Sequence, residues 1–355
     1  MQDQPVYKEK KKSLFERVKR RIYFLLRLID HPVVKVYTGY GNADKILVIG
    51  HVWKLSPMPR KTYRNNWITN FLAVIRLFMV KPYPCAAVTM QWDGQYFNTE
   101  TESDGFFKLE INPPASLKAG WYPVCVELLN DKFYGTTISG TGRVYIPSVA
   151  QHGFISDIDD TFLVSHSARI RRRLYVLFTK NARTRKLFDG VIHHYSALAK
   201  SGQQEGRTNP FFYVSSSEWN LYDFIMEFAR FNDLPKGIFL LGQMKQIKDF
   251  WKSGQNNHAT KFMRIVRIIE QYPAMKFVLL GDDSQQDPYI YHSLVKHFPD
   301  KILAVYLRRI HAPNYDRVIP LTKEMEACGV SCCYFEHSSQ AMIHSRKIGL
   351  VTEVV

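Results

Sequence analysis

Short apolar runs alternate with longer amphipathic segments from residue 153 onwards, and this alternation constrains the fold most strongly. Segments 218–231 and 258–272 have the apolar spacing of helices. Strands separated by helices form a parallel sheet covered on both faces, which explains why the runs are apolar throughout. We therefore expect an α/β domain over residues 149–355, with six strands at 153–156, 211–214, 237–241, 276–280, 302–307 and 331–335.

Residues 33–148 carry a different pattern, of short β-rich runs separated by Gly, Pro, Asn and Asp, such as KILVIGHVW, CAAVTMQW, FFKLEI and YPVCVELL. The dipeptide Asp104-Gly105 lies between two such runs and favours a β-hairpin. The pattern predicts an all-β, sandwich-like domain with a helix inserted at 65–80. It contains no motif that indicates chemistry.

The formal net charge is +16, which implies an anionic partner or surface. Most of the excess is concentrated in two segments, residues 1–30 with net +5 and residues 168–187 with net +8. Residues 1–32 form a basic N-terminal segment in which 13–29 has helical apolar spacing. Such a helix either lies on an anionic membrane or packs on the main body with its basic face in water.

No transmembrane helix is expected, because the longest apolar stretch, 67–80, is too short to span a bilayer and contains Arg76. No convincing secretory signal is present, and the five cysteines lack metal-binding spacing. These features predict a cytoplasmic protein with reduced thiols that is soluble or peripherally bound to membranes.

Paired carboxylates follow the first strand of the α/β domain, in FISDIDDTF at 154–162. In an extended chain Asp157 and Asp159 project to the same side, and Thr161 follows two positions later. Two carboxylates so close repel each other unless a cation lies between them, and Mg²⁺ accepts such oxygen ligands. One Asp is then a candidate nucleophile and the other a proton shuttle. Alone, an Asp-x-Asp is more often a turn or a helix cap.

Further polar residues follow other strands or begin helices. Ser215 follows FFYV, where it can bind a phosphoryl oxygen or simply cap the next helix. Lys261 lies in the first turn of a helix and can neutralise a phosphate, although a lone Lys is usually only solvated. The strand KFVLL runs into Asp282, Asp283 and Asp287. Asp282 is placed as a metal ligand, and Asp287 can orient Lys261 or a metal-bound water from outside the metal shell.

The order Asp-x-Asp-x-Thr, Ser, Lys, Gly-Asp-x₄-Asp resembles the four motifs of the haloacid dehalogenase superfamily. Around ISDIDDT, FYVSSSEWNLYDFI, HATKFMRIVRIIEQYP and KFVLLGDDSQQDPYIY the chain looks like the actin-patch-associated phosphatidate phosphatase family. The resemblance covers roughly residues 33–350, including a preceding β domain. It implies a Rossmann-like, haloacid dehalogenase-like catalytic domain and Mg²⁺-dependent hydrolysis of phosphatidate to diacylglycerol.

The resemblance also implies roles for individual residues. Asp157 would be the nucleophile and a metal ligand, and Asp159 the general acid and base that also contributes to the metal site. Asp282 would complete the metal site, and Ser215 and Lys261 would hold the phosphoryl oxygens.

Expected substrate contacts are Thr161 and Ser216, together with Arg171 and Arg172 of the basic segment, where this superfamily inserts a cap. That segment would touch an anionic bilayer or grip the substrate phosphate, or else form a solvated basic helix. The chain departs from the family at Asp283, where an extra charge follows the metal ligand, and at Ser216, where Asn is common. We place Asp283 with Asp287 around the metal ligands.

Three functions remain open on the sequence. The leading one is a phosphatase of phosphatidate or a related lipid phosphate, acting peripherally on membranes with an anionic phospholipid as its partner. The second keeps the chemistry but takes a soluble phosphomonoester or a nucleic-acid end phosphate, although nucleic acid is not the expected partner. The third is a binding module that no longer turns over, against which the retained Asp159 argues.

Overall fold

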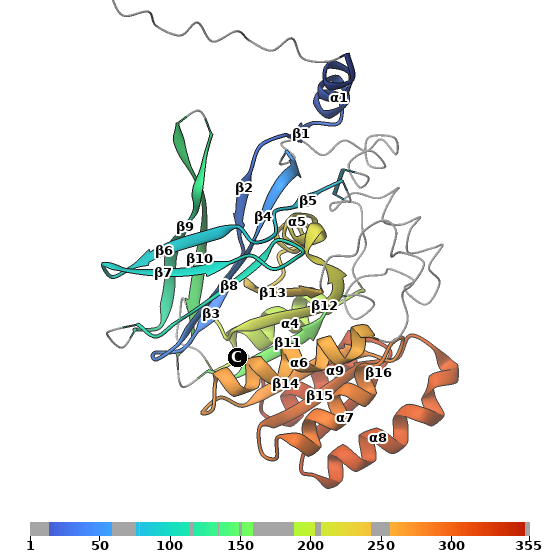
Figure 1. Ribbon diagram of the computed structural model, residues 1–355. Helices are drawn as coiled ribbons and strands as arrows, with labels where there is room; N and C mark the ends of the chain where they lie inside the picture. The colour runs from blue at the N-terminus through green and yellow to red at the C-terminus, as the bar shows by residue number, and fades with distance from the viewer. Residues whose placement is uncertain are drawn as a thin grey trace, which may run out of the picture.

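The computed structural model describes residues 14–58, 76–77, 79–113, 117–133, 135–148, 151–158, 188–202, 207–242 and 256–351 (Figure 1). Two β-sheets organise these residues. A largely antiparallel sheet occupies the N-terminal half and a parallel sheet with helices the C-terminal half. The mixed α/β character predicted from the sequence is confirmed.

The N-terminal sheet has ten strands in the order β1-β4-β3-β10-β9-β6-β7, with β2, β5 and β8 also paired to β4. Its pairs are antiparallel apart from β3 with β10. We refer to this part as the β domain; its description as a sandwich stays a prediction. Its strands are β1 (Leu28–Ile29), β2 (Val33–Val36), β3 (Gly39–Gly41), β4 (Ile46–Pro57), β5 (Lys81–Pro82), β6 (Ala87–Trp92), β7 (Gln95–Glu100), β8 (Phe106–Ile111), β9 (Gly120–Phe133) and β10 (Thr136–Ile146).

The prediction of a hairpin at Asp104-Gly105 is wrong, because the two strands that flank the turn do not pair with each other. A turn does form there, because Gly105 adopts a φ of 81° and its N–H donates to the Glu102 carbonyl. The strands on either side, however, pair elsewhere, β7 with β6 and β8 with β4. A Cβ at Gly105 would lie 2.5 Å from the Val52 oxygen, so the turn is shaped by its close approach to β4.

The C-terminal sheet has six parallel strands in the order β13-β12-β11-β14-β15-β16. All six predicted strands are confirmed: β11 (Gly153–Asp157), β12 (Phe211–Glu218), β13 (Gly237–Gly242), β14 (Phe277–Asp282), β15 (Ile302–Arg308) and β16 (Ser331–Phe335). Strands β11, β13 and β14 are buried along their whole length, as a sheet covered on both faces requires.

Among the helices of this half, α4 packs with α9, α6, α7 and α8 pack in succession, and α5 packs against β13. The predicted helix 218–231 begins later, because β12 continues to Glu218 and the short helix η1 (Trp219–Leu221) follows. The helices are α4 (Val191–Lys200), α5 (Tyr222–Phe231), α6 (Asn256–Gln271), α7 (Asp287–His297), α8 (Tyr315–Ala327) and α9 (Ser338–Lys347), with the short helix η3 (Ala312–Asn314) before α8.

The N-terminal helix α1 (Leu14–Leu25) confirms part of the helical prediction for 13–29. The helix ends earlier than expected, because Leu28 and Ile29 pair with the end of β4. Phe24 and Leu25 are 81% and 79% exposed. In the described part of the chain, no helix is both long and apolar enough to cross a bilayer. The helix expected at 65–80 lies mostly outside the described residues.

Candidate active site

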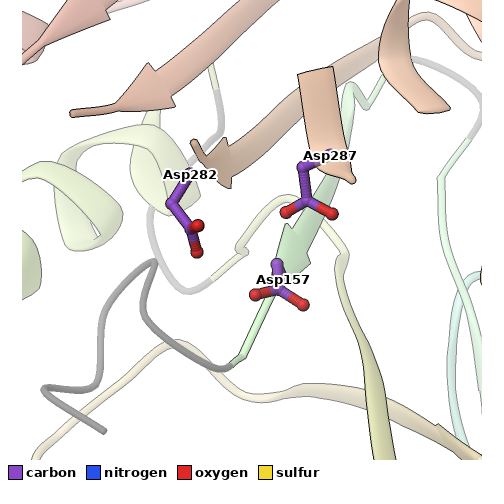
Figure 2. Close-up of side chains that lie close together, drawn as sticks. All are labelled: Asp157, Asp282 and Asp287. Carbon is purple, nitrogen blue, oxygen red and sulfur yellow. The ribbon is translucent and has the colours of Figure 1, made fainter. Parts of the chain in front are cut away.

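Three aspartates converge at the carboxyl edge of the parallel sheet. Asp157 is the last residue of β11 and Asp282 the last residue of β14, and these two strands are neighbours in the sheet. Asp287 is the first residue of α7, which follows β14. Figure 2 shows the three carboxylates facing a common space, and one oxygen of each lies within 4.8 Å of the others. The strand order reverses between β11 and β14, which is where open α/β sheets bind ligands.

Gly281 explains how α7 comes so close to the end of β14. A Cβ at this position would lie 2.7 Å from Asp287 Oδ2 and 2.8 Å from the Tyr291 hydroxyl. Tyr291 donates its hydroxyl proton to the Leu280 carbonyl at 2.9 Å, which fixes the helix on the strand. The glycine therefore allows Asp287 to reach the same space as Asp157 and Asp282.

Lys261 of α6 is buried among these carboxylates. Its Nζ lies 2.6 Å from Asp157 Oδ1 and also donates to Asp287 Oδ1. Burial by itself would lower the pKa of Lys261, but Asp157 and Asp287 outweigh that effect and raise the pKa above its usual value. Lys261 is therefore a cation at neutral pH, and it binds both carboxylates although its own side chain is only 2% exposed.

The charge balance of this cluster favours a divalent metal ion. In the described part of the chain, three carboxylates converge beside the Lys261 ammonium group, and Asp287 Oδ2 is buried there without a hydrogen-bond partner. Asp282 Oδ1 accepts a hydrogen bond from the Ser284 N–H at 2.6 Å. All the converging ligand atoms are oxygens, which is the donor set of hard divalent cations. The residues present therefore fit such an ion.

Asp283 lies next to Asp282 but binds elsewhere. Its Oδ1 accepts hydrogen bonds from the N–H groups of Ile310 and His311 at 2.7 and 3.1 Å. Its Oδ2 accepts one from the Tyr334 hydroxyl at 2.6 Å. The side chain therefore joins the loop that follows β15 to Tyr334 of β16.

Ser215 lies at the same edge of the sheet, one residue beyond the Val214 that pairs with Asp157. It is fully buried, and its Oγ accepts a hydrogen bond from the Ser217 N–H at 2.9 Å. Ser216 between them is partly exposed. The expected residues Asp159, Thr161, Arg171 and Arg172 lie outside the described residues.

The sequence did not single out Arg264. Its guanidinium donates to the Ser215 carbonyl at 2.6 Å and to the Leu240 carbonyl at 3.3 Å, joining the ends of β12 and β13. Burial, followed by the nearby Arg267, lowers its pKa to about 10, so it stays charged at neutral pH. One feature of the sequence could have pointed to Arg264: it lies three residues after Lys261, one turn further along the same helix.

Comparison with known proteins gives matches that span this site. The model of the family described as phosphatidate phosphatase APP1, catalytic domain, matches residues 152–309. Phosphatidate phosphatase APP1 of Saccharomyces cerevisiae is 31% identical over 159 residues, which are 44% of this chain and 25% of the yeast protein. An uncharacterized protein of Schizosaccharomyces pombe is 23% identical over 222 residues, which are 60% of this chain and 34% of that protein.

Solved structures are more distant. A carbohydrate acetylesterase from Xanthomonas citri aligns over 90% of this chain and 75% of its own at a TM-score of 0.33 and 10% identity, too weak a likeness to bear on fold or function. The family match, in contrast, contains Asp157, Ser215, Lys261, Asp282 and Asp287. The resemblance of this domain to the phosphatidate phosphatase APP1 family, predicted from the sequence motifs, is thereby confirmed.

Proposed function

We propose that this protein is a Mg²⁺-dependent phosphatase that hydrolyses phosphatidate, or a related lipid phosphate, to diacylglycerol and phosphate at a membrane surface. The observation that carries the proposal is the buried cluster of Asp157, Asp282, Asp287 and Lys261 at the edge of the parallel sheet. Buried charges are costly, so a cluster of this kind is a functional-site candidate. The family match supports phosphatidate as the substrate, although this chain spans only a quarter of the yeast enzyme.

The fold proposed for this domain is haloacid dehalogenase-like. The parallel strand order β13-β12-β11-β14-β15-β16 supports it, because the motif-bearing strands β11 and β14 are central neighbours. The second motif follows β12, on the other side of β11. Asp157, Ser215 and Asp282 lie at one edge of this sheet and Lys261 binds Asp157, which supports the resemblance to that superfamily.

In the proposed reaction, Asp157 attacks the substrate phosphorus in line, and the bond to the lipid oxygen breaks. Asp159 gives its proton to the departing alkoxide, so that the products are diacylglycerol and an aspartyl-phosphate. Asp159 then takes a proton from water, which attacks phosphorus and releases inorganic phosphate with the Asp157 carboxylate restored. Lys261 and Ser215 would hold the phosphoryl oxygens throughout.

Mg²⁺ would be held by Asp157 and Asp282, and by the backbone carbonyl of Asp159 as the resemblance implies. When bound, it would stabilise negative charge on the transferring group. Asp287 is close enough to serve as a ligand as well as a partner of Lys261. The Lys261 ammonium prevents the carboxylates from repelling one another and orients the Asp157 oxygen that it binds.

The proposed membrane contact involves α1. Val18, Ile22, Phe24 and Leu25 of this helix are exposed apolar residues, and Arg21 beside them is also exposed. An apolar surface bordered by basic residues is typical of helices that lie in the interface of anionic bilayers. The basic segment 168–187, which lies outside the described residues, would add a second contact.

The substrate class can be tested by measuring phosphate release. Vesicles that contain phosphatidate are compared with a panel of soluble phosphomonoesters, including a 5′-phosphorylated oligonucleotide, with Mg²⁺ and with EDTA. We expect Mg²⁺-dependent release from the vesicles. Hydrolysis of soluble esters alone would show that the substrate is a soluble phosphomonoester and not a lipid phosphate. No hydrolysis of any substrate would favour a binding module.

Membrane contact is tested separately by vesicle flotation. Replacing Phe24 and Leu25 together by Asp should reduce flotation with anionic vesicles, because two charges then occupy the apolar surface of α1. The matched control is Ile343→Asp, which changes a 65%-exposed apolar residue on α9. Equal flotation of both variants and the wild type would dismiss the role of α1.

A further inference from the structure

The segment Ser215–Ser217 leaves the regular pattern of the parallel sheet. Register pairs of β12 with β11 end at Val214, and those with β13 skip from Val214 to Glu218. The segment carries the proposed phosphate-binding serine at the point where sheet pairing no longer sets its position. Other contacts must therefore hold it.

One support comes from within the parallel-sheet domain. Arg264 donates to the Ser215 carbonyl at 2.6 Å, and its own side chain is held by Thr260, whose carbonyl and Oγ1 it contacts at 3.0 and 3.1 Å. This contact fixes the start of the segment. It does not reach the other end.

The other end is held by the β domain. Trp219 directly follows β12 and is buried, and its ring stacks on Tyr37 with centroids 4.3 Å apart and planes 17° apart. Tyr37 also packs against Tyr222 of α5 at 4.4 Å, and the Thr38 N–H donates to the Tyr222 hydroxyl at 3.1 Å. These contacts place α5 against the β domain, as Figure 1 also shows.

Tyr37 is itself firmly placed. Its N–H donates to the Ile49 carbonyl at 2.9 Å, and its hydroxyl lies 3.0 Å from His51 Nδ1. His51 stacks on Trp53 with centroids 4.3 Å apart. Burial raises the pKa of Tyr37 and lowers the pKa of His51 to about 3, so both stay neutral in ordinary buffers and the contact is not a pH switch.

We propose that the β domain acts as a positioning element for the active site, with Tyr37 as the positioning residue that holds Trp219 and, through it, the Ser215–Ser217 segment. The inference rests on the proposed function, because it gives that segment the task of binding the phosphoryl group. The β domain then supplies no reacting atom. It contributes the rigid surface against which one wall of the site is built.

The test compares three variants of the full chain. Tyr37→Leu removes the stacked ring, and Tyr37→Phe keeps the ring but removes the hydroxyl. Tyr122→Leu is the matched control, because Tyr122 belongs to the β domain but packs on Trp92, away from the parallel sheet. Should Tyr37→Leu fail to fold, Trp219→Phe weakens the same stack from the other side.

The activity readout separates positioning from general damage. We expect Tyr37→Leu to lower kcat/KM about 10- to 100-fold, the effect of an ångström-scale displacement of a binding group. Inhibition by orthovanadate should weaken in parallel, while the Mg²⁺ concentration for half-maximal activity stays unchanged because the aspartates lie on β11, β14 and α7. Tyr37→Phe keeps the stacked ring, so its kcat/KM and its inhibition by orthovanadate should stay close to the wild-type values.

Hydrogen exchange supplies a readout that needs no turnover. Amides of residues 215–221 should exchange faster in Tyr37→Leu, while those of β14 and α7 stay as protected as in the wild type. Unchanged exchange in 215–221, or the same increase in Tyr122→Leu, overturns the inference. If the wild type hydrolyses no phosphoester, the proposed function is wrong. The exchange data then test the positioning role of Tyr37 by themselves.

Discussion

The two sheets of this protein treat charge in opposite ways. In the parallel-sheet half, Asp157, Lys261, Asp282, Asp287 and Arg308 are at most 4% exposed. In the β domain the buried polar residues that the structure describes are Thr38, His51, Ser56, Thr89 and Thr101, none of which carries a charge at neutral pH. Charged side chains of the β domain, such as Glu110 and Lys45, pair on its surface.

This difference shows which part of the molecule bears the free-energy cost of buried charges. Moving a charged group out of water costs several kcal/mol, and even a well-paired buried ion pair is often no better than an apolar replacement. The β domain avoids that cost and contributes shape and apolar contact. The edge of the parallel sheet bears this cost, as expected of the proposed metal and phosphate site.

The largest effect should follow from removing the proposed nucleophile. Asp157→Asn should lower kcat by at least about 10⁴-fold, since an amide cannot form the aspartyl-phosphate. Asp159→Asn should be similarly inactive, because no group would protonate the leaving alkoxide. Phosphate release from phosphatidate vesicles measures both, with circular dichroism to verify folding. Hydrolysis near the wild-type rate by either variant would refute the mechanism.

Lys261→Met tests the cost of the buried charges directly. The variant leaves Asp157 and Asp287 without their shared cation, so the free energy of unfolding should fall by about 3–5 kcal/mol in the absence of metal. Mg²⁺ should recover part of this loss. Urea unfolding with and without Mg²⁺ gives the comparison, and Lys296→Met, which removes a surface partner of Glu324, is the control.

The pH dependence of that loss has a definite sign. Because the folded-state pKa of Lys261 is raised, its contribution is complete at neutral pH and disappears only as the solution becomes strongly alkaline. Equal unfolding free energies for Lys261→Met and the wild type at pH 7 would show that the ion pairs contribute nothing to stability.

The neighbours Asp282 and Asp283 form a matched pair with different expected effects. Asp282→Asn should raise the Mg²⁺ concentration for half-maximal activity at least about tenfold, because a ligand loses its charge. Asp283→Asn should leave that concentration unchanged and instead cost about 1–3 kcal/mol of stability, through its bonds to Ile310, His311 and Tyr334. A raised Mg²⁺ requirement in Asp283→Asn would place that carboxylate with the metal after all.

The sequence was sufficient for the parts of the site that depend on local pattern. The apolar runs located the parallel strands, and parallel strands end at one edge, so Asp157, Ser215 and Asp282 had to meet there. The sequence alone did not separate Asp283 from Asp282, whereas in the structure Asp283 directly follows β14 and the two side chains bind different partners.

Contacts between distant elements could not be predicted in this way. The carbonyl partners of Arg264 lie 49 and 24 positions away in the chain. Tyr37 lies between β2 and β3 of the β domain, whereas Trp219 lies in η1, next to the parallel sheet. The Asp104-Gly105 turn shows the same limit, because local turn chemistry was right while the choice of strand partners was decided by packing on β4. Periodicity identifies a buried face, but it does not identify what covers that face.

The smallest effect is expected on the surface of the β domain. Glu110 accepts hydrogen bonds from Lys108 at 2.7 Å and lies 2.6 Å from Lys45 Nζ, and its side chain is 41% exposed. Hydrogen bonding to Lys108, and then to Lys45, lowers its pKa from 4.5 to about 2. Since water screens such pairs, Glu110→Gln should cost less than about 1 kcal/mol at neutral pH.

A lowered pKa fixes how that small difference changes with pH. The contribution of Glu110 is present above its ordinary pKa of 4.5 and is lost as the pH falls towards 2, so the unfolding free energies of Glu110→Gln and the wild type should converge over this range. Molar salt should also reduce the difference. A loss of several kcal/mol, comparable to that of Lys261→Met, would show that the β domain too depends on its charges and would remove the contrast between the two sheets.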